Sequence, residues 1–164
     1  MRIVRIILTA LVILVLQVTL VHSVEIGGAA PDLIIILLIA LVMERGPVTA
    51  VVIGFSLGFL QDLGNASYLG MNALAKSLIA YGVSRFGQGF LPESILFRGF
   101  LIFVVSLVND VIVLVITTFS FLDVLVGFFR FSLLSALYTA LVGMAVLQLV
   151  KLATGRVVRP GGRY

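Results

Sequence analysis

The residues that could do chemistry in this chain are few, and the first candidate is a serine. The G-x-S-x-G pattern that surrounds the nucleophilic serine of many hydrolases occurs at Gly54-Phe55-Ser56-Leu57-Gly58. That pattern needs a strand-turn-helix setting and a general base, but here it lies within an apolar run, and His22 is the single histidine of the chain. The sequence has no cysteine, which excludes disulfides and thiolate nucleophiles. We therefore expect no enzyme activity, no cofactor and no metal site.

Small residues recur every four positions in the same run. They are Ala50, Gly54 and Gly58, and Asp62 follows at the same spacing. Residues four apart share one face of a helix, so these small residues form a ridge. Such a ridge lets another helix approach closely, which is how helices associate in lipid. It predicts close helix packing, either within this chain or with a partner helix.

Polar side chains inside the apolar runs form the third candidate group. Four expected helices bring polar residues to one depth, with a neighbouring amide and a further carboxylate nearby: Gln17, Lys76, Asp110 and Arg130, then Asn109 and Asp62. Burying one ionised group near the bilayer centre costs ~2.5–3.5 kcal/mol on insertion scales, so the charged members should face inward and pair. We expect one intramembrane network, with Asp110 within reach of Lys76 or Arg130. Its role stays open among a clamp for helix packing, a ligand or ion site, and a polar patch for a partner.

The composition defines the environment of these residues. Of the 164 residues, 62% are hydrophobic and 11% are charged, whereas soluble domains have about 45–50% apolar and about 25% charged residues. This composition excludes a water-soluble domain. Because a membrane-spanning helix takes about 20 residues, the length leaves room for six crossings and for no separate catalytic domain.

The elements that must position the polar residues are six apolar runs. They cover residues 3–22, 33–43, 48–60, 68–83, 94–119 and 122–152. Pro31 and Asp32 suit the start of the second run, because proline lacks an amide hydrogen and a carboxylate complements the helix dipole. The sixth run is too long for an upright crossing, so it must tilt, bend or project. We predict an all-α integral membrane fold, with one six-helix domain over residues 1–155 and a basic cytoplasmic tail over 156–164.

Basic residues indicate the orientation of these runs, because Lys and Arg near the ends of spans stay on the cytoplasmic side. Six runs leave no basic residue in the outward loops and nine on the opposite side: Arg2, Arg5, Arg45, Arg85, Arg98, Lys151, Arg156, Arg159 and Arg163. We therefore expect both termini in the cytoplasm. The net charge of +4 then reflects topology, and we expect no nucleic-acid partner.

Several short motifs occur in a characteristic order. They are Pro31-Asp32-Leu33, Gly54-x-x-x-Gly58-Phe59-Leu60-Gln61-Asp62, Leu69-Gly70-Met71-Asn72-Ala73-Leu74, and a late Leu137-Tyr138-Thr139-Ala140. With six expected spans, this order resembles the rod shape-determining protein MreD family over nearly the whole chain. The positions that carry the resemblance are Pro31, Asp32, Gly54, Gly58, Asp62, Gly70 and Asn72.

The resemblance implies a multi-pass protein of the bacterial plasma membrane without catalytic activity. It implies a scaffold of the cell-elongation machinery that binds the single-span protein MreC, works with other elongation proteins and supports lateral peptidoglycan synthesis. Candidate faces for such a partner are the small-residue ridge and the aromatic run Phe128, Phe129 and Phe131.

The same family is similar in fold to the S components of energy-coupling-factor transporters, which supplies the alternative function. An S component would bind a vitamin or a metal from the outer side, where the polar residues are expected. S components usually carry an alanine-x-x-x-alanine pattern in their first helix, whereas Ala10 is the single alanine of the first run here. Vitamin pockets also tend to use aromatic stacking, and the chain has no tryptophan. We therefore expect the scaffold function first.

Overall fold

The computed structural model describes residues 2–19, 29–43, 45–64, 69–87, 94–117 and 121–154. The regular elements in these ranges are helices, so the predicted all-α class is confirmed. In chain order they are α1 (Arg2–Thr19), α2 (Leu33–Val42), α3 (Pro47–Asp62), α4 (Met71–Phe86), α5 (Ile95–Thr117), α6 (Phe121–Gly127), the π-helical segment η3 (Phe128–Ser132) and α7 (Leu133–Thr154). The predicted tail over 156–164 and His22 lie outside the described residues.

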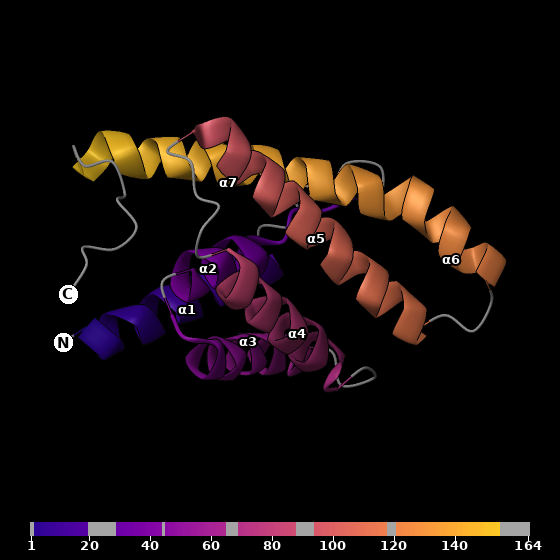
Figure 1. Cartoon of the computed structure of the whole chain (residues 1–164), viewed down its shortest axis with the longest axis horizontal. Coiled ribbons are helices and arrows are strands. Elements are labelled where there is room, and N and C mark those ends of the chain that lie inside the picture. The colour runs from indigo at the N-terminus through magenta and orange to yellow at the C-terminus, as the bar shows by residue number, and fades with distance from the viewer. Residues whose placement is uncertain are drawn as a thin grey trace.

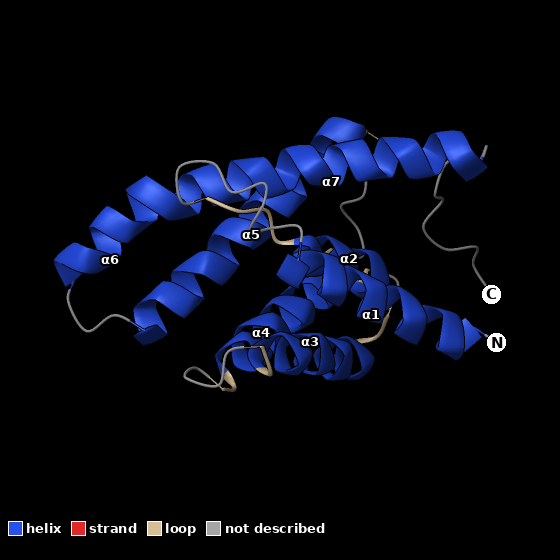
Figure 2. Ribbon diagram, turned by 180° about the vertical axis from the view of Figure 1, so that it is seen from behind, coloured by secondary structure: helices blue, strands red, loops and turns tan. Residues whose placement is uncertain are grey.

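The helices are arranged as two packed pairs around a central helix. One pair is α3 with α4, and the other is α5 with α7 (Figure 1). The view from behind shows the same two pairs, with α1 and α2 beside α3 and α4 (Figure 2). The central helix is α2, which contacts α1, α3, α4, α5 and α7.

The helix α2 is the core of the molecule. Its 10 residues extend about 15 Å at 1.5 Å per residue, which is half of a hydrocarbon core about 30 Å thick. All ten of its residues are apolar, and six of them are buried: Ile34, Ile35, Leu37, Leu38, Ile39 and Val42. A helix that is apolar all round belongs inside a protein. One end of α2 therefore lies within the bundle, where its backbone groups need protein partners.

Among the described residues, two stretches of helix are long and apolar enough to cross a membrane, Ile95–Thr117 and Val124–Leu149. Large apolar side chains on them face outward, such as Phe100 and Leu149, which are 61% and 64% exposed. Extended apolar surface of this kind marks contact with lipid or with a partner. Together with the composition, these helices indicate a membrane protein.

The long sixth run bends. Helices α6 and α7 join through η3 without a break, and Figure 1 shows the helix changing direction between the α6 and α7 labels. A π-helical turn is a recognised cause of such a kink. Of the three outcomes expected for this run, the structure shows the bend.

Candidate functional site

The small-residue ridge of α3 packs against α4 of the same chain. A Cβ added at Gly54 would collide with the main-chain carbonyl of Lys76, and one added at Gly58 would collide with that of Asn72. The backbones of α3 and α4 are therefore in direct contact along the ridge. This packing closes the ridge to a partner helix, which corrects one of the two candidate partner faces.

The G-x-S-x-G match has no catalytic setting in the structure. Ser56 lies in the middle of α3 on its exposed side, and its Oγ donates to the Val52 carbonyl oxygen of the same helix at 2.8 Å. A nucleophile elbow needs a sharp strand-to-helix turn. The motif here reflects the ridge spacing.

The close packing of α3 on α4 brings Asp62 against the start of α4. Its carboxylate accepts hydrogen bonds from the backbone N–H groups of Gly70, Asn72 and Ala73 at 3.0, 3.1 and 3.0 Å. Gly70 has φ +97°, a left-handed conformation that favours glycine. Asp62 therefore caps α4 and satisfies the free amides of its first turn.

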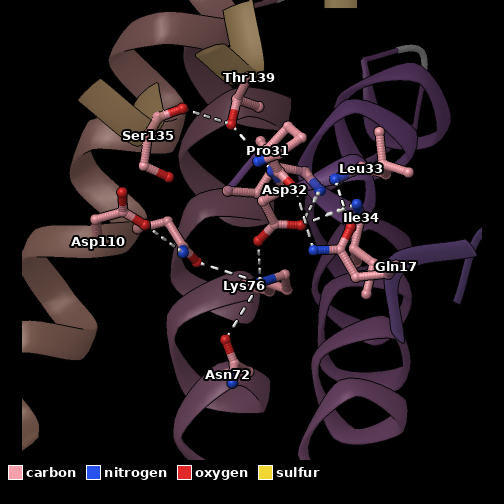
Figure 3. Close-up of polar contacts among 12 residues, drawn as sticks. Gln17, Pro31, Asp32, Leu33, Ile34, Asn72, Lys76, Asp110, Ser135 and Thr139 are labelled. Carbon is pink, nitrogen blue, oxygen red and sulfur yellow. Dashed lines mark hydrogen bonds and ion pairs between the residues drawn. The ribbon is translucent and has the colours of Figure 1, made fainter. Parts of the chain in front are cut away.

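Asn72 links this cap to a buried lysine. Its Nδ2 donates to Asp62 Oδ1 at 2.9 Å, while its Oδ1 accepts from Lys76 Nζ at 3.3 Å. The side chain of Lys76 is 0% exposed, and its ammonium also donates to Asp32 Oδ2 at 3.2 Å and to Asn109 Oδ1 at 3.4 Å (Figure 3). An ammonium has three donors, so all three of its hydrogens are used.

Asp32 caps α2 with its other carboxylate oxygen. Oδ1 accepts from the backbone N–H groups of Ile34 and Ile35 at 2.9 and 3.1 Å. The N–H of Asp32 itself donates to Thr139 Oγ1 on α7 at 3.0 Å. Asp32 thus joins the start of α2 to α4 through Lys76 and to α7 through Thr139.

Gln17 from α1 completes the capping of α2. Its Nε2 donates to the Pro31 carbonyl oxygen at 3.1 Å, and its Oε1 accepts from the Leu33 N–H at 2.8 Å. A helix end inside a membrane requires partners of this kind, because lipid offers none. The start of a short helix is thereby stabilised away from water.

These contacts define what we call the polar cluster. Its members come from α1, α3, α4, α5, α7 and the turn before α2: Gln17, Asp32, Asp62, Asn72, Lys76, Asn109, Asp110 and Thr139. A buried, mutually bonded network fixes one arrangement of the elements that supply it. Among the positions that carry the family resemblance, Asp32, Asp62 and Asn72 belong to this cluster, and Pro31 and Gly70 bond to its members through backbone atoms. Gly54 and Gly58 form the α3–α4 contact.

Two expectations for the network are wrong. Lys76 pairs with Asp32, and Asp110 instead accepts a hydrogen bond from Asn109 Nδ2 at 3.4 Å. Arg130 does not join the cluster; it is exposed on η3, with its guanidinium carbon 5.4 Å from the centre of the Phe131 ring. A long arginine side chain can reach an interface or an aromatic face, so it need not turn inward.

The aromatic run is largely on the surface. Phe129 is 71% and Phe131 41% exposed, while Phe128 is half-buried and packs edge-on against Phe129 at 5.2 Å between ring centres. This second candidate partner face therefore stays available.

Sequence reasoning missed Asp32 as the partner of Lys76, and it missed Thr139. Asp32 was expected at a helix start and as a position of the family resemblance, but not in the network. The available signal was the length of the second run, because a helix too short to cross must begin inside the bundle. In the part of the chain that the structure describes, no three His, Cys, Asp or Glu side chains gather as a metal site.

Comparison with known protein families shows which family this chain matches. The family model of the rod shape-determining protein MreD matches residues 1–154, which is nearly the whole chain. No curated protein and no solved structure matches.

Proposed function

Because the chain belongs to the rod shape-determining protein MreD family, we propose that it is a non-catalytic membrane scaffold of the bacterial cell-elongation machinery. In this role it binds a single-span partner of the MreC type and supports lateral peptidoglycan synthesis. The observation that carries the proposal is the family match over residues 1–154. The polar cluster then acts as a clamp that holds six helices in one arrangement.

The scaffold crosses the plasma membrane six times, with both termini in the cytoplasm. The distribution of basic residues supports this topology, and so does one contact between turns. Ser84 Oγ donates to the Arg45 carbonyl oxygen at 2.5 Å, so the turn after α2 lies beside the last turn of α4, which carries Arg85. These two basic positions therefore lie at one end of the bundle, and Asp62 lies at the other end of α3.

Two surfaces can receive a partner helix. One is the exposed aromatic run on η3. The other is an apolar groove of about 590 Å³ between α4 and α5, lined by Leu78, Ile79, Gly82, Val83, Phe86, Gly87, Phe97, Leu101, Val104, Val105, Val108 and Ile112. A Cβ added at Gly82 would meet nothing within 4 Å, so a helix can approach closely at that point. We propose that the MreC-type partner occupies this groove and extends toward the aromatic run.

Co-purification with the partner tests this proposal. Gly82→Leu fills the groove while leaving the packed helices untouched, and it should lower recovery of the MreC-type partner by about tenfold, as loss of a central contact does. Ser56→Leu is the matched control, because it makes a similar enlargement on the exposed side of α3. Unchanged recovery with both Gly82→Leu and Phe129→Ala would contradict the assignment of these surfaces.

A further inference from the structure

A polar cavity of about 380 Å³ lies beside the polar cluster, against α5 and η3. Its polar lining includes two carboxylates and three side-chain amides, from Asp32, Asp110, Gln61, Asn72 and Asn109. Its apolar lining includes Val113, Leu114 and Phe131. This volume falls within the range of about 300–1,000 Å³ typical of small-molecule sites.

Lys76 donates to three residues that line this cavity, Asp32, Asn72 and Asn109. These bonds take all three hydrogens of its ammonium. The Asn109 side-chain amide donates a hydrogen bond to Asp110. The cavity therefore has no free cation among the described residues to receive an anionic ligand.

Acceptors, in contrast, are left over. The Asp32 carboxylate pairs with Lys76 and accepts hydrogen bonds from two backbone amides. The Asp62 carboxylate accepts hydrogen bonds from three backbone amides and from the Asn72 side chain. The Asp110 carboxylate accepts a side-chain hydrogen bond from Asn109 through Oδ1, and this bond is long, at 3.4 Å. Figure 3 shows Asp110 at the far end of the chain of contacts that begins at Lys76.

A second acceptor at this cavity has no partner. Gln61 Oε1 is fully buried and makes no hydrogen bond, although a buried amide oxygen normally has a donor. Gln61 and Asp110 come from different helices, α3 and α5, and both line the same cavity. An ionised carboxylate at this depth requires a counter-charge, and a buried amide oxygen requires a donor.

We propose that this cavity binds a small organic cation that carries N–H donors, such as a primary ammonium, through Asp110 and Gln61. Its apolar part lies on Phe131 and the adjacent aliphatic side chains of α5. The space of about 380 Å³ has room for a molecule of several heavy atoms, because one water takes about 30 Å³. The proposal is independent of the partner-binding function, since neither residue lies in the α4–α5 groove.

The test uses the full-length protein in lipid nanodiscs, with n-butylammonium chloride as the probe. We expect it to raise the Tm in proportion to its concentration and to bind in the millimolar range, as suits so small a molecule. Equimolar 1-butanol has the same alkyl chain and controls for entry into the bilayer, and sodium chloride controls for charge. No increase with butylammonium, or an equal increase with 1-butanol or with sodium chloride, would overturn the proposal.

Three variants assign the binding to these residues. Asp110→Asn keeps the shape and removes the charge, so it should weaken butylammonium binding by about tenfold or more. Gln61→Leu removes the unpaired acceptor and should weaken binding several-fold without lowering the Tm of the ligand-free protein. Ser106→Ala is the matched control. Ser106 lies on α5, and its Oγ is also buried without a hydrogen-bond partner, but the residue does not line the cavity.

The outcomes separate the site from general packing. If Asp110→Asn fails to fold, butylammonium binding by Gln61→Leu alone tests the proposal. Unchanged binding in Gln61→Leu, or equal weakening in Ser106→Ala, would show that the cavity does not hold the cation in the way proposed.

Discussion

Lys76 is the residue on which the interior of this protein depends most. It is a fully buried cation bonded to Asp32, Asn72 and Asn109. Such a charge is tolerated only while its partners remain, because the interior cannot solvate it or the carboxylate that it neutralises. Its contacts reach the start of α2, the first turn of α4 and the middle of α5.

Lys76→Met should destabilise the protein strongly. Methionine fills similar space but leaves Asp32 as a buried carboxylate without its cation, and losing one partner of a buried pair costs about 3–5 kcal/mol. Denaturant unfolding in mild detergent micelles measures the change. Adding Asp32→Asn to Lys76→Met should recover part of the lost stability, since the unpaired charge is then removed. A cost for Lys76→Met as small as that of the exposed Ser56→Ala would contradict the described pairing.

The sequence could predict the depth of polar residues but not the direction in which each points. Gln17, Lys76 and Asn109 were expected at one depth, and they do meet in the polar cluster. Arg130 was expected there at a similar depth and lies on the surface instead. Hydropathy locates a residue along a helix axis, whereas rotation about that axis depends on packing that the sequence does not state.

Among the helices, α3 and α4 form the most intimate contact. Gly54 and Gly58 bring the two backbones together, and Asp62 then reaches across to cap α4. The close packing of α3 on α4 and the capping of α4 therefore both follow from the four-residue spacing of Gly54, Gly58 and Asp62. Gly82 offers a contrast, because it lies on α4 away from any neighbour within 4 Å.

Gly58→Ala and Gly82→Ala should therefore have opposite effects on stability. An added methyl at Gly58 runs into the main chain of Asn72 and should cost about 1–3 kcal/mol, typical of overpacking. At Gly82 the methyl has room, and alanine favours a helix by roughly 0.5–1 kcal/mol over glycine. The same unfolding assay compares the two, and Gly54→Leu should be more damaging than either. Equal effects of the two alanine substitutions would contradict the close packing of α3 on α4.

Helix positions were predictable to within a few residues. The second run was expected at 33–43, and α2 covers Leu33–Val42. The fourth was expected from residue 68, but α4 begins at Met71, because Gly70 is left-handed and Asp62 binds the first amides there. The bend at η3 was one of three outcomes open for the long last run. Apolar composition gives the length of a run but not the cap or the π-helical turn that shapes it.

For the molecule as a whole, we predict six crossings of the membrane with both termini in the cytoplasm. Reporter fusions inserted at Asn65 and placed after Tyr164 should report opposite sides of the membrane. The physical reason is that basic residues near span ends resist translocation, and the six-span arrangement leaves none in the outward loops. Reporters on the same side would show that the number of crossings is not six.

We propose that this protein is a scaffold for rod shape, and depletion in its source bacterium is the sharpest test of that function. Cells should change from rods to rounded forms without losing uptake of any vitamin, and expression of the wild-type chain should restore the rods. Lys76→Met should fail to restore them, whereas Ser56→Ala should succeed, because only the former disrupts the arrangement of the helices. Cells that keep their rod shape but acquire a vitamin requirement would contradict the scaffold and favour the S-component function instead.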